Sequence, residues 1–520
     1  MQRADVEERY QIWRQKNEKG NFSSFRRALK AFVYRPLISV CLLAKGDQTH
    51  LSECVDSILN QYYQNFELCV LAAESMGEWK DKRVFFIQND DVGAALDAIR
   101  GEFVVFLRGD GTFSPDALFQ VVSLLNAHRD AELIYSDEDV MGKDRGSPLF
   151  KPDYSPDTLL SYHYISNLAV YRTSLVREIG AFRDEYDLAL RFTEKTDCIY
   201  HIPKVLYHRR KVMENSSYSV VEDAMKRRGY RADLKKIEEA GACFVRFRPK
   251  EDDFVSIIIP TKDNARVLDR CLSSIYEKTT GVSYEIIVVN NNGSEPETFA
   301  LFEHYQKQYD NFCVLTQNVP YNYSALNNEA VKIAKGNLLL FLNNDVEVIS
   351  PDWLFDMAGE ATRCEIGAVG AKLLFPDRSI QHAGIVLLGK LEVGVHLGYR
   401  IDERKVLYDP RYVTNRNVSA VTGACLMMRR RVFEEVGGFD ESLAVEFNDV
   451  DLCLKALRAG YRNLYMGQVC LYHYESMTRR AIENSKRLND SILKMANRWG
   501  DFKDPYFDPD VELKLLHYRI

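Results

Sequence analysis

The sequence lacks the patterns that identify several common classes of protein. It has no run approaching the about 18 apolar residues that a membrane-spanning helix needs, and its N-terminus has no apolar signal-peptide region. The 11 cysteines form no CxxC pair, which fits a reducing cytosol better than a disulfide framework. A net charge of −7 gives no reason to expect nucleic acid as a partner. We therefore expect a cytoplasmic protein that does not bind nucleic acid.

What the sequence does contain is an internal repeat within 520 residues, a length that accommodates two or more domains. Matched segments follow one another in the same order in both copies: LSECVDSI at 51–58 with LDRCLSSI at 268–275, GEFVVFLRGD at 101–110 with GNLLLFLNND at 336–345, and YRTSLVREIGAF at 171–182 with MRRRVFEEVGGF at 428–439. The separation between partners grows in steps, which indicates insertions in surface loops of the second copy. The repeat predicts two similar domains at 36–212 and 253–480.

Three further segments flank or join the predicted domains. We expect a polar linker at 213–252, a basic helical extension at 1–35 and a helical tail at 481–520. Within the extension, residues 21–35 carry four basic side chains and no acidic one. Two interpretations stay open: a solvated helix, or a peripheral contact with anionic lipid at the inner face of the cell membrane.

Short apolar runs alternate with helical patterns in each copy, which predicts an α/β fold with a mostly parallel, Rossmann-like sheet in each of two tandem domains. Ligands of such sheets bind beyond the carboxyl ends of the strands. In the second copy these ends are polar: Thr261 to Asn264, Asn290 to Ser294 and Asn343 to Asp345. No GxGxxG follows either first strand, which argues against a dinucleotide-binding oxidoreductase.

Asp345 and His473 are candidate ligands of a metal ion in the second copy. An aspartate after a strand is often only a turn residue, but an Asp and a His recur at matched places in the first copy as Asp110 and His208. One carboxylate, one imidazole and the oxygens of a diphosphate suit Mn²⁺ or Mg²⁺.

Asp449 and Asp451 lie in the first turn of a helix predicted to end at Arg458. Favourable interaction with the helix dipole explains acids there without any catalysis. Since residues i and i+2 do not share a helix face, at most one of the two points into a cleft.

Several motifs together resemble one known family. VSIIIPTKDN, EIIVVNNNGS, LLLFLNNDVEV, GACLMMRRRVFEEVGGFDE, FNDVDLCLKALRAGYR and LYHYES are similar to those of the inverting family-2 glycosyltransferases of the GT-A fold. The likeness is closest to tandem-domain members that build bacterial O-antigens, capsules and other surface polysaccharides, often as rhamnosyltransferases. It implies two tandem GT-A domains, a nucleotide-sugar donor (UDP- or dTDP-sugar) and a lipid-linked or oligosaccharide acceptor.

The resemblance also implies residue roles. Asp449 matches the catalytic base, and Asp345 with His473 matches the metal site. Asn343, Asn344 and Asp345 are similar to the family's DxD motif. The remaining roles are the nucleotide pocket, at Thr261, Asp263, Asn291, Asn292, Asn343 and Asn344, and the acceptor side, at His382, His396 and Asp451.

The first copy departs from the pattern. Arg108 and Gly109 replace Asn343 and Asn344. Glu185 stands at the position of Asp449, and the loop before it is shorter than the corresponding loop of the second copy. We expect this domain to be degenerate and to support the fold, bind acceptor or mediate assembly, for example of a homo-oligomer. Two alternatives stay open: both domains are active, or the chain is a non-catalytic glycan-binding scaffold.

Overall fold

The computed structural model describes residues 3–18, 22–44, 49–72, 79–88, 92–142, 145–210, 218–388, 394–474 and 485–507. The chain forms two compact units, of which the first ends at Arg228 and the second begins at Gly229. The predicted linker 213–252 is therefore divided: its helix belongs to the first unit and its hairpin to the second. Of the predicted tail 481–520, residues 485–507 are described and begin with a helix, while 481–484 and 508–520 lie outside the described residues.

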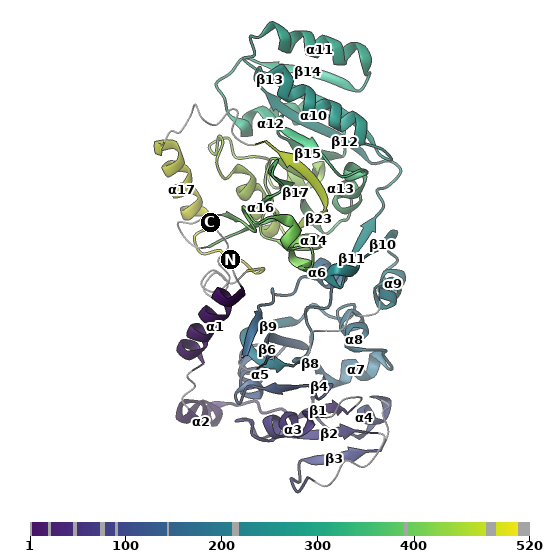
Figure 1. The fold of residues 1–520 in the computed structure, drawn as a ribbon, viewed down its shortest axis with the longest axis vertical. Helices are drawn as coiled ribbons and strands as arrows, with labels where there is room; N and C mark the ends of the chain where they lie inside the picture. Colours follow the sequence, from purple (N-terminus) through teal and green to yellow (C-terminus); the bar gives the residue numbers. More distant parts are fainter. Residues whose placement is uncertain are drawn as a thin grey trace. The chain divides into compact units, whose positions relative to one another are not determined.

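The first unit alternates strands and helices around one sheet, drawn in purple and blue in Figure 1. Its strands are β1 (Ile38–Leu43), β2 (Phe66–Leu71), β3 (Val84–Ile87), β4 (Phe103–Leu107), β5 (Gly111–Phe113), β6 (Leu133–Met141), β7 (Arg145–Leu149), β8 (Ala169–Arg172) and β9 (Ile199–Arg209). Its helices are α1 (Arg3–Asn17), α2 (Phe22–Ala31), α3 (Leu51–Leu59), α4 (Val92–Ala98), α5 (Ala117–Ala127), α6 (Pro156–Ser161), α7 (Thr173–Ile179), α8 (Glu185–Phe192) and α9 (Tyr218–Arg227).

The second unit, in teal, green and yellow in Figure 1, begins with the hairpin β10 (Ala232–Ile237) and β11 (Ala242–Phe247). Its further strands are β12 (Phe254–Thr261), β13 (Ser283–Asn291), β14 (Phe312–Gln317), β15 (Leu338–Leu342), β16 (Val346–Val348), β17 (Ile366–Leu374), β18 (Ile380–His382), β19 (Ile385–Val386), β20 (Val395–His396), β21 (Asn415–Val418), β22 (Cys425–Arg429) and β23 (Arg462–His473). Its helices are α10 (Ala265–Lys278), α11 (Pro296–Gln308), α12 (Tyr323–Ile333), α13 (Trp353–Ala361), α14 (Pro410–Val413), α15 (Arg430–Glu435), α16 (Asn448–Arg458) and α17 (Ser485–Trp499).

The two large sheets have the same strand order. In the first unit it is β3-β2-β1-β4-β8-β6-β9-β5, and in the second it is β14-β13-β12-β15-β22-β17-β23-β16. Strands β1 and β2, like β12 and β13, pair in parallel, whereas β4 with β8 and β15 with β22 pair antiparallel. The α/β class and the two tandem domains predicted from the repeat are confirmed.

Both units also repeat one buried junction between neighbouring strands. In the first, Ser39 Oγ donates to Glu67 Oε1 at 2.7 Å and accepts from Gly101 N at 2.9 Å. In the second, Ser256 Oγ accepts from Gly336 N at 2.8 Å. A Cβ at Gly101 or Gly336 would lie 2.5 or 2.6 Å from backbone atoms of the adjacent strand, so only glycine allows the strands to approach there.

Helix α10 is an example of a helix that buries an apolar stripe against its sheet. Helix α10 places Leu268, Cys271, Leu272 and Ile275 at helical spacing, and all four join the core that contains Ile257 of β12. Full burial of such an aliphatic side chain contributes about 1.5 to 3 kcal/mol. The core therefore fixes the sheet edge from which the functional side chains project.

The N-terminal extension packs on the first unit. Tyr10 of α1 is buried and donates to Asp139 Oδ2 at 2.6 Å. Phe25 of the next helix, α2, and Phe32, directly after that helix, have ring centroids 4.8 and 5.3 Å from that of Phe119. The apolar face of α2 is thus occupied by protein, which leaves electrostatic attraction by its exposed basic side chains as the remaining route to a lipid surface. No helix among the described residues combines the length and the apolarity required to cross a membrane.

Three consecutive acids of β6 are buried in the first unit, and each has cationic partners. Asp137 is 2.8 Å from His201 Nε2, Glu138 is 3.1 Å from Lys151 Nζ, and the third, Asp139, is 2.7 Å from Arg145 Nε. Burial disfavours charge on His201, but Asp137 and Asp153 outweigh it and raise the pKa of His201 to about 9. His201 is therefore an imidazolium in the folded chain at neutral pH.

This assignment predicts how stability depends on pH. Because the pKa of His201 is about 9 when folded and 6.5 when unfolded, its contribution is complete below pH 6.5 and is lost as pH rises toward 9. We expect the free energy of unfolding of the wild type to fall relative to that of His201→Gln by up to about 1.4 kcal/mol per pH unit across this window. Urea unfolding of both chains at pH 6, 7.5 and 9 measures it. Identical pH dependence of the two chains would contradict the assignment.

Candidate functional site

The polar strand ends of the second unit meet at one edge of its sheet. Parallel pairing places Thr261, at the end of β12, opposite Asn290 of β13. Beyond the end of β15, Asn344 Nδ2 donates to Thr261 Oγ1 at 2.8 Å. The side chains that the sequence analysis assigned to a nucleotide pocket thus share the carboxyl edge of neighbouring strands, where ligands of such sheets bind.

Asp345 and His473 are brought together by the pairing of β16 with β23. Val346 lies opposite His473 in this antiparallel ladder, and Tyr474 N donates to Asp345 O at 2.9 Å. The side chains follow: His473 Nε2 is 3.1 Å from Asp345 Oδ1. Asn343 Nδ2 is 3.2 Å from the same imidazole nitrogen. The predicted pair is therefore in contact, although its members are more than a hundred positions apart in the chain.

The chemistry of this pair fits a cation. His473 Nδ1 is 2.5 Å from Gln381 Oε1, and because an amide oxygen only accepts, this hydrogen bond assigns a proton to Nδ1. The lone pair of Nε2 then faces the Asp345 carboxylate, and positive charge between them, a second imidazole proton or a metal ion, stabilises the arrangement. In the described part of the chain, no group of three or more His, Cys, Asp or Glu side chains is arranged to hold a metal. Two protein ligands leave the other positions to oxygens of a ligand or of water.

Asp449 is the second acid at this edge, in the first turn of α16. Its Oδ2 accepts from Gly423 N at 2.7 Å, and its Oδ1 accepts from Val450 N at 2.8 Å. The next residue after Gly423, Ala424, accepts from Asn343 N at 3.0 Å, so one short backbone segment links Asp449 to the strand end that carries Asp345. The carboxylate is partly exposed and its two oxygens are oriented by the backbone.

Asp451 does not face the site, and its predicted place on the acceptor side is wrong. It is fully buried, and its Oδ1 accepts from Arg498 Nη1 at 2.6 Å and from Trp499 Nε1 at 3.0 Å. Lys455 Nζ is 3.3 Å from its other oxygen. The sequence analysis expected one of the two acids to turn away from the cleft, but two partners of Asp451, Arg498 and Trp499, come from α17, whose packing no local pattern reveals.

Three side chains predicted to bind nucleotide also shape the loops at the rim. Asp263 accepts from Ser294 N at 2.7 Å and from Glu295 N at 2.9 Å, and these backbone donors lower the pKa of its carboxyl. Asn291 Nδ2 donates to Gln317 O and Val319 O. Asn292 Nδ2 also donates to Val319 O, at 2.6 Å. Contact of these residues with a nucleotide stays a prediction.

His382 and His396 lie together, with their Nδ1 atoms 3.1 Å apart. Burial, with smaller contributions from His396 and Arg416, lowers the pKa of His382 well below its usual value, so this imidazole is neutral. His382 is fully buried and His396 is partly exposed. Of the two predicted acceptor-side histidines, only His396 is reachable from solvent in this conformation.

The first unit does not reproduce the Asp–His contact, and the predicted match of His208 with His473 is wrong by one residue. Gly111 pairs with Arg209, and Arg210 N donates to Asp110 O at 3.1 Å, so Arg209 occupies the register position of His473. His208 points to the other face, because side chains alternate along a strand. There its Nδ1 is 2.7 Å from Asp139 Oδ1 and its Nε2 is 2.9 Å from Ser114 Oγ.

In the first unit, the acid that corresponds to Asp449 is Glu185, and it forms an ion pair with Arg108. Arg108 Nε donates to Glu185 Oε1 at 3.0 Å, and Arg108 Nη2 donates to Glu185 Oε2 at 2.7 Å. Burial opposes the charge, but the Arg108 guanidinium outweighs it and lowers the pKa of Glu185. A guanidinium therefore binds this carboxylate in the two-pronged geometry of the strongest ion pairs.

Three residues that contact candidate site residues were not singled out in the sequence: Gln381, Gly423 and Arg498. Gln381 directly precedes His382 in a segment that was singled out only for its histidine. A Cβ at Gly423 would lie 3.4 Å from both Asp449 Cβ and Tyr323 Oη, a close approach that was visible in sequence only as one more glycine. Arg498 lies in a tail whose helix carried no recognised motif.

Comparison with known proteins gives the following similarities. Residues 256–437 match the family described as Glycosyl transferase family 2. The chain is 37% identical to the uncharacterized protein y4gI of Sinorhizobium fredii, over 92% of this chain and 58% of that protein. It is 34% identical to the O-antigen biosynthesis protein RfbC of Myxococcus xanthus, over 97% of this chain and 42% of that protein. The chain thus spans about half the length of these curated relatives. The crystal structure of GalNAc-T7 with UDP, GalNAc and Mn²⁺ is similar with a TM-score of 0.38 and 15% identity, covering 51% of this chain and 53% of that one.

The contacts of Asp263 predict that its substitution destabilises the loop at residues 292–295 and lowers the free energy of unfolding. Asp263→Ala removes a carboxylate that accepts two backbone N–H groups, and we expect it to lower the free energy of unfolding by about 1 kcal/mol at pH 7. The matched control is Asp310→Ala, at an exposed acid beyond α11, where we expect no measurable change. Urea unfolding measures both. Unchanged stability together with weakened binding of a nucleoside diphosphate would contradict the structural assignment of Asp263.

Proposed function

We propose that the second unit of this chain, which belongs to glycosyltransferase family 2 through residues 256–437, transfers a sugar from a nucleoside-diphosphate donor. The observation that carries the proposal is the convergence of Asp345, His473 and Asp449 at the carboxyl edge of one sheet. The similarity to a Myxococcus xanthus protein named for O-antigen biosynthesis supports a growing bacterial surface polysaccharide as the acceptor.

Asp345 and His473 would hold a divalent cation, Mn²⁺ or Mg²⁺, because a carboxylate and the unprotonated nitrogen of an imidazole face each other there. When bound, such an ion neutralises negative charge that develops on a departing diphosphate. Gln381 keeps the imidazole in the orientation and tautomer that the pair requires.

Asp449 acts as the general base. One of its carboxylate oxygens takes the proton from an acceptor hydroxyl while that oxygen forms a bond to the anomeric carbon of the donor. The bond from this carbon to the diphosphate oxygen breaks, and its electron pair leaves with the nucleoside diphosphate. Attack opposite the leaving group inverts the anomeric centre, so no enzyme nucleophile is needed. The backbone donors Gly423 N and Val450 N hold the carboxylate in place without consuming its remaining lone pairs.

Under this proposal, the first unit has no glycosyltransferase activity. Arg209 stands where a neutral imidazole would ligate, and Arg108 neutralises the acid Glu185. Both guanidinium groups are paired with carboxylates, Arg209 with Glu138 and Arg108 with Glu185, and a guanidinium has no lone pair to offer a metal ion. Supporting the fold, binding acceptor glycan and mediating assembly are the roles left to this unit.

The donor is a UDP- or dTDP-sugar, with rhamnose as the sugar that the family likeness favours, and the acceptor is a lipid-linked or free oligosaccharide. A panel of UDP-glucose, dTDP-rhamnose and GDP-mannose, tested for metal-dependent binding and hydrolysis, examines this. If no member of the panel binds, the proposed function fails.

Substitution of the two corresponding acids, Asp449 and Glu185, distinguishes between the alternative functions of the chain. We expect Asp449→Asn to lower the rate of donor hydrolysis or transfer by about 10²- to 10⁴-fold, because the amide cannot accept the proton. We expect Glu185→Gln to leave the rate unchanged. The measurement is release of nucleoside diphosphate from each member of the panel.

Two outcomes would contradict this assignment. If Glu185→Gln abolishes one linkage while another persists, both units are active and the chain is bifunctional. If neither substitution slows the reaction, Asp449 is not the base and the catalytic assignment is wrong.

The second-sphere contact of His473 predicts a change in metal affinity. Gln381→Leu removes the acceptor for Nδ1, and we expect it to weaken binding of Mn²⁺ in the presence of UDP by about 10- to 100-fold. The matched control is Gln468→Leu in β23, whose amide donates only to Val413 O among its described contacts and should not affect the metal. Electron paramagnetic resonance of unbound Mn²⁺ measures both. Equal affinities in the two variants would contradict the metal site.

A further inference from the structure

Helix α17 contacts residues 440–451, the segment that carries Asp449, through three basic side chains. Arg487, Lys494 and Arg498 recur at helical spacing on one face of it. Arg487 Nη2 is 2.7 Å from Glu446 Oε1, and Lys494 Nζ donates to Ser442 O at 2.8 Å. All three side chains of this face thus reach residues between 440 and 451.

Arg498 joins the two ends of that segment. Its Nη2 donates to Asp440 Oδ2 at 2.6 Å, and its Nη1 donates to Asp451 Oδ1 at 2.6 Å. One guanidinium therefore closes residues 440–451 into a loop, with Asp449 inside it. Burial opposes the charge of Asp440, but Arg498 and the backbone of Ser442 hold the pKa of Asp440 at about 2, so this contact stays ionic at neutral pH.

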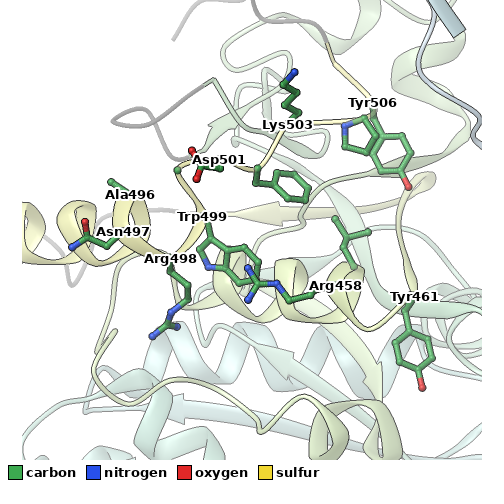
Figure 2. Close-up of a pocket in the computed structure, with 14 residues that line it drawn as sticks. Arg458, Tyr461, Ala496, Asn497, Arg498, Trp499, Asp501, Lys503 and Tyr506 are labelled. Carbon is green, nitrogen blue, oxygen red and sulfur yellow. The ribbon is translucent and has the colours of Figure 1, made fainter. Parts of the chain in front are cut away.

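The end of α17 is itself anchored. Trp499 is almost fully buried, its Nε1 donates to Asp451 Oδ1 at 3.0 Å, and the Arg458 guanidinium lies 4.0 Å from its ring centroid. Figure 2 shows Arg498 and Trp499 leaving adjacent positions of the helix, with Arg458 of α16 against the indole. These three residues line a cavity of about 810 Å³. The indole and the cation–π contact hold Arg498 at the point where it reaches both acids.

The first unit bridges a shorter segment, and it does so from within. From Phe182 to Asp187 the chain advances 5 positions, against 12 from Phe439 to Asp451. Arg191 of helix α8 binds the buried acid Asp187, with Nε and Oδ1 3.0 Å apart, and its Nη1 donates to Ala181 O at 3.0 Å. The longer loop of the second unit needs a restraint from outside its own helix, since each added residue carries conformational freedom that must be removed.

We propose that Arg498 is a positioning residue for sugar transfer: by bridging Asp440 and Asp451 it fixes the loop 440–451 and so orients Asp449 toward the acceptor oxygen. The inference rests on the proposed role of Asp449 as the base. Arg498 touches neither donor nor acceptor, and its effect reaches the reaction only through the loop.

The test compares Arg498→Met, Arg498→Lys and Asp440→Asn with the control Arg487→Met, which removes another cation of the same helix face. UDP-glucose, dTDP-rhamnose and GDP-mannose are supplied to the full chain, and kcat is expressed per site that binds the corresponding nucleoside diphosphate with Mn²⁺. This normalisation removes losses caused by unfolded protein. We expect kcat per site to fall 10- to 100-fold in Arg498→Met with the donor KM unchanged, to recover in part in Arg498→Lys, and to fall less in Asp440→Asn, which breaks one arm only.

Each result has a defined meaning. If kcat per site stays at the wild-type value in Arg498→Met while Asp449→Asn is inactive, the positioning role is overturned and the proposed function stands. If Arg487→Met loses as much as Arg498→Met, the effect belongs to general packing of α17 and the positioning role is likewise overturned. If the wild type processes no donor, or Asp449→Asn is as active as the wild type, it is the proposed function that fails. Should Arg498→Met not fold, Asp440→Asn with unchanged kcat per site overturns the positioning role.

Discussion

The antiparallel register between β16 and β23 is the constraint on which the site depends. It sets Val346 opposite His473, and the imidazole then faces the carboxylate of the preceding residue, Asp345, across 3.1 Å. A slip by one residue would turn the imidazole to the other face of the sheet, because the side-chain period of a strand is two. Gln381, on β18, which pairs with β17, completes the arrangement by binding Nδ1. The proposed metal site is therefore positioned by this one pairing.

The first unit shows the same scaffold with a different set of charges. Its strand order repeats that of the second unit, yet the register of β5 with β9 sets Arg209 where His473 stands. Arg108 then binds Glu185 with both arms of its guanidinium. Buried charges need partners, and here the partners come from the chain itself. The fold is thus retained while arginines occupy the positions that correspond to His473 and Asn343.

Much of the fold was accessible from sequence, because repeated apolar runs and strand-end polar residues have short-range signatures. The two domains and the meeting of Asp345 with His473 follow from such patterns. The rest depends on tertiary packing. The match of His208 to His473 failed because the repeated LYH motif is one residue out of structural register, which only the ladder of β9 reveals. Asp451 was misplaced because its partners Arg498 and Trp499 lie almost fifty positions away, on a helix with no motif of its own.

The central claim is that the second unit alone holds a divalent cation between Asp345 and His473. A crystal structure of the full chain grown with Mn²⁺ and UDP, using anomalous scattering from manganese, measures this most directly. The account predicts one anomalous peak within coordination distance, about 2.0 to 2.2 Å, of both Asp345 Oδ1 and His473 Nε2, and none near Asp110 and Arg209. A peak in the first unit, or an ordered UDP in the second unit without metal at Asp345 and His473, would contradict it.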